Sequence, residues 1–193
     1  MFECPEEEAL TEQIVEKISQ EILPNPLECL WQKYQELSQN YTDCKIKVQV
    51  KFFLLTKKVT NFLKDSIYNC HKVLLVSSGK FFKNLFLHGF MESLNKDPIN
   101  LGNIDSKIFE YILCFISFED EFANLPTNIL KEEDWISVLK TAQYLTLYKL
   151  QSICEQRLVE LLTPENVFFL LDLSILYHSE ILEKGCLSYI ASK

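Results

Sequence analysis

The stretch that decides the fold runs from Cys70 to Phe86 and reads CHKVLLVSSGKFFKNLF. Apolar residues recur every three or four positions on both sides of Gly79, which predicts two short helices joined at that glycine. A hydrophobic and acidic tip, Phe90–Ser93, follows just beyond the second helix. The stretch therefore predicts a helical hairpin that carries a distinct tip.

The composition predicts a globular protein in a reducing compartment. The 193 residues are 48% hydrophobic and 24% charged, which is sufficient for a packed core. The seven cysteines are widely spaced and lie mostly in apolar stretches, which favours buried thiols over disulfides. The first residues are acidic, unlike a secretory signal, and no apolar run reaches the length of a membrane span. We expect a cytoplasmic or nuclear location, or both.

The charged and polar residues argue against nucleic-acid binding and against catalysis. The net charge is −8, and Arg157 is the single arginine, whereas phosphate backbones are usually bound by clustered basic residues. The sequence has no glycine-rich phosphate loop and no nucleophile elbow. His71 follows Cys70, but no further metal ligand or orienting acid lies at a suitable spacing. We predict no catalytic residue, no metal and no cofactor, and therefore no enzyme.

The first part of the chain alternates helices with short strands. Residues Glu6–Leu23 carry an apolar residue at every fourth position, which predicts an amphipathic helix. A second helix follows with Leu27, Leu30, Trp31, Tyr34 and Leu37 on one face. Alternating residues predict a half-buried strand over 45–50 and a partner strand over 67–69. Between them, 51–66 is interpreted as an extended or inserted strand and loop.

The second part of the chain is mostly helical. A short strand is expected over 98–101, and Asp105 is expected to cap a helix over 106–117. Glu119–Thr127 is predicted to be a loop because it contains Pro126. The remaining helices are centred on Trp135–Leu147, Leu150–Leu161, Asn166–Tyr177 and Ser179–Ala191. Few strands early and many helices later indicate an α+β fold.

Several short motifs, in their shared order, resemble the BTB/POZ family, and within it the speckle-type POZ protein group. The matching segments are Leu27–Trp31, Tyr41–Cys44, His71-Lys72, Phe81–Phe86, Cys114–Ile116, Ala142–Tyr144 and Leu150–Cys154. The resemblance implies a small sheet of three to five strands flanked by a helical cluster. It also implies three parts: an N-terminal helix and linker over 1–26, a BTB/POZ domain over 27–162 and a C-terminal helical pair over 163–193. That pair resembles the start of the helical extension found in cullin-binding members.

Three features depart from the family pattern. The segment between the first two strands is longer than the usual tight hairpin. Ser117 stands where the family usually has a tyrosine near the cullin surface. The helix over 6–23 precedes the usual start of the domain. The first two departures bear on the sheet geometry and on the cullin contact.

The tip resembles the motif by which some BTB domains bind cullin-3. In the family, a hydrophobic side chain enters a cullin pocket and a glutamate lies beside it. The resemblance assigns these roles to Phe90, Met91 and Glu92, with His88 at the same exposed tip. The alternative is that Phe90 packs on its own domain and Glu92 is solvated.

The helix that begins at Leu27 is the expected dimer interface, because BTB first helices commonly pack across a two-fold axis. Leu27, Leu30, Trp31 and Tyr34 would form that interface, since an apolar stripe with a tryptophan suits an isologous contact. The alternative is that the same stripe packs within one subunit.

The resemblance implies a homodimeric adaptor of a cullin-3 ubiquitin ligase, with the cullin, a second copy and an unknown substrate protein as partners. No substrate-recruiting domain is recognisable in these 193 residues. The rival hypothesis is a dimerisation scaffold with a transcriptional or assembly role that never binds a cullin. Ser117 favours the scaffold, whereas the tip and the C-terminal helical pair favour the adaptor.

Overall fold

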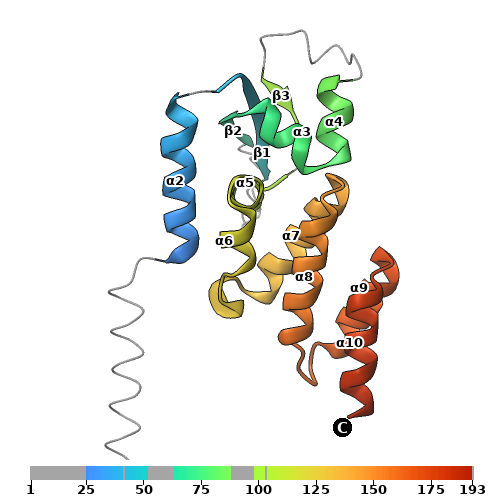
Figure 1. The fold of residues 1–193 in the computed structure, drawn as a ribbon. Helices are drawn as coiled ribbons and strands as arrows, with labels where there is room; N and C mark the ends of the chain where they lie inside the picture. The colour runs from blue at the N-terminus through green and yellow to red at the C-terminus, as the bar shows by residue number, and fades with distance from the viewer. Residues whose placement is uncertain (1–24, 41, 52–62, 88–97, 103, 193) are drawn as a thin grey trace, which may run out of the picture.

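A computed structural model describes residues 25–40, 42–51, 63–87, 98–102 and 104–192, which form a small sheet above a helical cluster (Figure 1). The predicted helix over 6–23 lies outside the described residues. The elements, in chain order, are α2 (Pro26–Asn40), β1 (Cys44–Lys51), β2 (Leu63–Cys70), α3 (Lys72–Ser78), α4 (Lys80–Leu87), β3 (Ile99–Asn100), α5 (Ser106–Ser117), α6 (Glu119–Ala123), the 3₁₀ turn η2 (Thr127–Ile129), α7 (Glu132–Tyr144), α8 (Tyr148–Glu160), α9 (Val167–Tyr177) and α10 (Glu180–Ala191).

The described sheet has the strand order β2-β1-β3. β1 pairs antiparallel with β2, where Cys44 lies opposite Cys70, and parallel with β3, where Ile46 lies opposite Ile99. Ile46 and Val48 are fully buried, as the alternation of apolar and polar residues in this strand predicts. The mixed sheet and the helical majority confirm the α+β fold.

The helical hairpin forms as predicted, with α3 and α4 meeting at Gly79. A Cβ atom at Gly79 would lie 2.8 Å from Leu147 Cδ2 and 3.1 Å from the Thr146 carbonyl oxygen. The backbone amide of Phe81 also donates to Thr146 Oγ1 at 2.9 Å. A residue without a side chain is needed here because the hairpin packs closely against the turn between α7 and α8.

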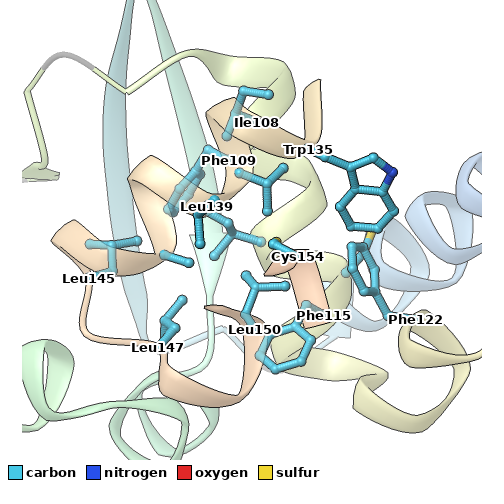
Figure 2. Packing of buried hydrophobic residues seen from close by; sticks show 14 of the residues in the cluster. Ile108, Phe109, Phe115, Phe122, Trp135, Leu139, Leu145, Leu147, Leu150 and Cys154 are labelled. Atoms are coloured by element: carbon cyan, nitrogen blue, oxygen red, sulfur yellow. The ribbon is translucent and has the colours of Figure 1, made fainter. Parts of the chain in front are cut away.

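Asp105 caps α5 as predicted, and this helix forms the centre of the core. The Asp105 carboxylate accepts hydrogen bonds from the backbone amides of Lys107 and Ile108. Figure 2 shows side chains from α5, α6, α7 and α8 converging on one cluster. Trp135 is completely buried there, and its ring meets Phe122 edge to face at 6.3 Å.

The predicted loop over 119–127 is wrong, because residues 119–123 form the helix α6 and residues 127–129 form η2. Three acidic residues in the first turn of α6, Glu119 to Glu121, favour a helix N-terminus. Phe122 then anchors the helix, since its side chain is buried against Phe115 and Trp135. One anchor in five residues gives no helical periodicity, so the sequence pattern did not indicate the helix.

Two other predicted boundaries also differ from the structure. β2 extends over 63–70 rather than 67–69, because all eight of its residues pair with β1. Leu145 and Leu147 lie in the turn after α7, where both are still fully buried. Because these turn residues are apolar like the buried face of α7, the sequence pattern did not show where the helix ends. Residues 52–62, within the segment of uncertain interpretation, lie outside the described part.

The C-terminal helices α9 and α10 form an antiparallel hairpin that packs against α8 (Figure 1). The Ser179 hydroxyl caps α10 by accepting from the backbone amide of Leu182 at 3.2 Å. A Cβ atom at Gly185 would lie 2.5 Å from Val159 Cγ2, so the glycine permits close approach of α10 to α8. In the described residues, no helix is both long enough and apolar enough to cross a membrane.

Candidate protein-interaction surfaces

The stripe predicted to form the dimer interface lies mostly inside its own subunit. Leu27, Leu30 and Tyr34 are 4%, 3% and 4% exposed, and α2 packs on α5 and β2. The Tyr34 hydroxyl donates to the Asn69 carbonyl oxygen at 2.7 Å, which fixes α2 beside β2. These three side chains match the alternative of packing within one subunit, and their role in a dimer stays a prediction.

Trp31 is the member of that stripe that remains partly exposed. Its ring stacks on Tyr34 at 5.2 Å and meets Tyr68 edge to face at 5.9 Å. Cavities of about 450 Å³ and 390 Å³ share Trp31 and Glu110 as lining residues. Trp31 of α2 therefore lies between the two cavities and lines both of them.

The predicted cullin-binding residues His88, Phe90, Met91 and Glu92 lie outside the described residues. The last described residue before them is Leu87, which ends α4 and is 60% exposed. The roles of these four residues stay predictions.

The two helices of the C-terminal hairpin carry seven large apolar side chains that are exposed. We define the C-terminal apolar surface as Phe168, Phe169, Ile175 and Leu176 of α9 with Ile181, Leu187 and Ile190 of α10. Phe168 and Leu176 are 65% and 67% exposed, which is unusual for side chains of this size. The sequence of α9, VFFLLDLSILY, is apolar on most sides of the helix.

Two exposed tyrosines flank the turn between α7 and α8 and were not identified as surface residues from the sequence. Tyr144 packs its ring against Phe81 of α4 at 5.5 Å, and Tyr148 begins α8. Both residues are more than half exposed. In the sequence, each tyrosine is a large, mostly apolar residue at a helix end. Such a residue can be buried or exposed, so the sequence does not show which.

Asp43 supports the start of α3, a role that the sequence reasoning missed. One Asp43 carboxylate oxygen accepts from the backbone amide of Lys72 at 2.7 Å. His71 occupies the N-cap position of α3 but makes no side-chain capping bond. The helix is thus capped by a side chain from the chain segment before β1. The described residues contain no group of three or more histidine, cysteine or acidic side chains that could hold a metal.

The described cysteines that lie in the core are thiols of low reactivity. Burial raises the pKa of Cys70 to about 11 and that of Cys114 to about 12. Burial also raises the pKa of Cys44 to about 12. Since the thiolate is the nucleophile and the metal ligand, these groups are protonated and inert near neutral pH. The six described cysteines are free; four of them are buried, and Cys29 and Cys44 are partly buried.

Comparison with known proteins identifies the fold family. The BTB/POZ domain model matches residues 32–162. A BTB/POZ domain-containing protein of Arabidopsis thaliana is 32% identical over 129 residues, which cover 65% of this chain and 36% of that protein. The mouse inhibitor of Bruton tyrosine kinase is 29% identical over 148 residues, which cover 70% of this chain and 10% of that protein.

A third relative is Kelch-like protein 25 of Rattus norvegicus, which is 26% identical over 117 residues. That match covers 60% of this chain and 18% of the relative. The chain thus spans about a third or less of the length of these curated relatives. The family match extends over most of the chain and agrees with the mixed sheet and the hairpin at Gly79. This chain belongs to the BTB/POZ family, whose domain is a protein-interaction module.

Proposed function

We propose that this chain is the homodimeric BTB subunit of a cullin-3 RING ubiquitin ligase and links a target protein to the cullin. The proposal begins from the BTB/POZ domain. It also draws on the resemblance of Phe90–Glu92 and of the C-terminal helical pair to cullin-binding members of the family. In this assembly, Phe90 is the anchor that enters the cullin pocket, and Met91, Glu92 and His88 also contact the cullin. We further propose a cytoplasmic or nuclear location.

The observation that carries the proposal is a series of exposed apolar side chains on elements that contact one another. α4 ends with Leu87, and its start packs on the turn that carries Tyr144 and Tyr148. α8 begins after that turn and packs against α10, which carries part of the C-terminal apolar surface. Figure 1 draws α4, α8 and the α9–α10 hairpin along the same side of the molecule. A large exposed apolar surface marks a protein contact, and a helical cullin repeat would bury it.

Isothermal titration against the N-terminal domain of cullin-3 tests this proposal. The wild-type chain should bind with submicromolar affinity, and the double variant Phe90→Ala, Glu92→Ala should lose that binding while remaining folded. Ile67→Ala is the matched control, because Ile67 is an exposed apolar side chain at the far edge of the sheet. Absence of binding by the folded wild-type protein would contradict the adaptor function.

The second candidate is a cullin-independent BTB scaffold, and Ser117 favours it. Ser117 ends α5 and is half-buried, so the aromatic ring that the family usually places there is missing. Replacing Ser117 with tyrosine would separate the two candidates. A gain of cullin affinity in Ser117→Tyr from an undetectable wild-type level would support the scaffold as the native function.

A further inference from the structure

β2 is one of the two outer strands of the described sheet, whose strand order is β2-β1-β3. β2 pairs with β1 through all eight of its residues, and its other side faces α2 (Figure 1). An unpaired strand edge presents backbone donors and acceptors that an extended peptide can pair with.

The register identifies the β2 residues whose backbone N–H and C=O both point away from β1, and Ile67 is one of them. The Lys47 carbonyl oxygen accepts from the Leu101 amide at 3.0 Å, so the backbone groups of Lys47 point toward β3. Ile67 lies opposite Lys47 in β2 and therefore points its N–H and C=O away from β1. The Asn69 carbonyl oxygen points to the same open side, where Tyr34 already occupies it. Ile67 is 56% exposed.

A cavity of about 390 Å³ lies along this edge, between α2 and β2. Trp31 and Tyr68 form two of its walls, with their rings edge to face at 5.9 Å. Glu110 of α5 also lines the cavity and accepts a hydrogen bond from the Tyr68 hydroxyl at 2.9 Å. Two aromatic rings and a carboxylate therefore surround one hollow beside the Ile67 backbone.

The charges of the groove select a cationic ligand. Glu110 is the one ionisable acid or base among the cavity's lining residues other than tyrosine, and it forms no salt bridge in the described part of the chain. Two lysines of the adjoining helices are paired with other acids: Lys33 of α2 with Glu121 at 2.6 Å and Lys107 of α5 with Asp134 at 3.3 Å. Burial, and to a smaller extent the hydrogen bond to Glu110, raise the pKa of Tyr68. The hydroxyl therefore stays protonated and donates to the Glu110 carboxylate at neutral pH.

We propose that this groove binds an extended segment of a partner protein that carries a lysine or arginine. The segment pairs with the N–H and C=O of Ile67 as an added strand. Side chains alternate in a strand, so the residue next to the one opposite Ile67 points to the same side as Tyr68. Its cationic group lies against Trp31 and Tyr68 and pairs with Glu110. An apolar side chain of the segment covers Ile67 on the other side.

Fluorescence titration with a short peptide tests the proposal. The probe is a capped pentapeptide of alternating threonine and valine with arginine at its centre. Trp135 is completely buried, so a change in tryptophan emission on binding reports on Trp31. The proposal predicts saturable binding below about 1 mM and a shift of the Ile67 amide resonance. A peptide with citrulline in place of arginine should bind about tenfold or more weakly.

The protein variants separate the groove from general charge effects. Glu110→Gln keeps an acceptor for the Tyr68 hydroxyl and should weaken binding of the arginine peptide by about tenfold. Glu165→Gln removes the same charge from the exposed connection between α8 and α9, and it should leave binding unchanged. N-methylation of the peptide residue that pairs with Ile67 should also weaken binding.

Three outcomes would overturn the proposal. The first is equal binding of the arginine and citrulline peptides, and the second is no saturation by about 1 mM peptide. The third is a change of oligomeric mass in Glu110→Gln on ultracentrifugation, which would assign the groove to a second copy of this chain. Loss of cullin binding affects none of these measurements, because the groove residues differ from the proposed cullin contacts. Trp31 and Tyr34 also belong to the predicted dimer interface, and the ultracentrifugation distinguishes that use from peptide binding.

Discussion

Arg157 shows how much one side chain determines at the scale of a residue. Its guanidinium donates to the carbonyl oxygens of Ala123 and Leu125, each at 2.8 Å, and to Thr127 Oγ1 at 3.1 Å. It also pairs with Glu160 at 2.9 Å. The single arginine, which argued against nucleic-acid binding, thus fastens the α6–η2 connection to α8. The planar guanidinium group has several N–H donors in fixed directions, so it suits this set of acceptors better than the single ammonium group of a lysine.

Replacing Arg157 with methionine should lower the free energy of unfolding by about 2–4 kcal/mol, because three partly buried acceptors lose their donor. Arg157→Lys should recover only part of this loss. Urea unfolding followed by tryptophan fluorescence measures both, since Trp135 Nε1 donates to the Thr127 carbonyl oxygen nearby. The exposed pair Lys184–Glu180 provides the control: Lys184→Met should change stability by less than about 0.5 kcal/mol. Equal effects of the two methionine variants would contradict this role for Arg157.

At the scale of elements, Gly185 sets the contact between α10 and α8. Gly185→Ala should destabilise the protein by about 1–3 kcal/mol, although alanine favours helix formation, because the added methyl group overlaps Val159. In a Val159→Ala background, the same change should be neutral or stabilising by up to about 1 kcal/mol. Thermal unfolding of the four proteins in this double-mutant cycle measures the coupling. Additive effects would show that the two side chains do not meet.

The pairing of β1 with β2 brings Cys44 opposite Cys70, and their buried thiols predict a loss of stability in alkali. Burial raises the pKa of Cys44 to about 12 and of Cys70 to about 11, whereas an unfolded thiol ionises near its ordinary value of about 8.5. Above that pH the unfolded chain releases protons that the native protein keeps, so the free energy of unfolding falls as pH rises. Urea unfolding under reducing conditions at about pH 7.5 and about pH 9.5 measures the change. A Cys44→Ala, Cys70→Ala variant should show a smaller decrease, and an identical decrease would exclude these thiols as its cause.

The elements that the sequence predicted best have local signals. Asp105 caps α5, Gly79 separates α3 from α4, and the β1 alternation is visible in six residues. α6 could not be predicted in this way, because what stabilises it is Phe122 packed on residues distant in the sequence. The groove beside β2 was missed for the same reason. Its residues Trp31, Tyr68 and Glu110 come from three separate elements, and only the folded chain brings them together.

At the scale of the whole molecule, the burial of α2 makes a prediction about the dimer. Leu30→Ala should lower the free energy of unfolding by about 2–5 kcal/mol, because Leu30 packs on the core of its own subunit. The loss should not depend on protein concentration. Unfolding at several concentrations, with sedimentation equilibrium for the mass, measures both properties. A Leu30→Ala protein that unfolds like the wild type but sediments as a monomer would assign Leu30 to the dimer interface instead.

The attachment of the C-terminal hairpin has a consequence for motion. α10 packs on α9 and α8, and Asn166 adds one side-chain bond to Glu132 of α7 at 2.7 Å. The centre of the core, around α5 and Trp135, lies elsewhere. We therefore expect the hairpin to open as a separate cooperative unit while the sheet and α5 stay folded. Hydrogen–deuterium exchange should be faster in α9 and α10 than in α5, and a protease should cleave first in the exposed connection Thr163–Glu165. A partner that covers the hairpin would slow both processes, so the exchange rate of this unit reports its occupancy.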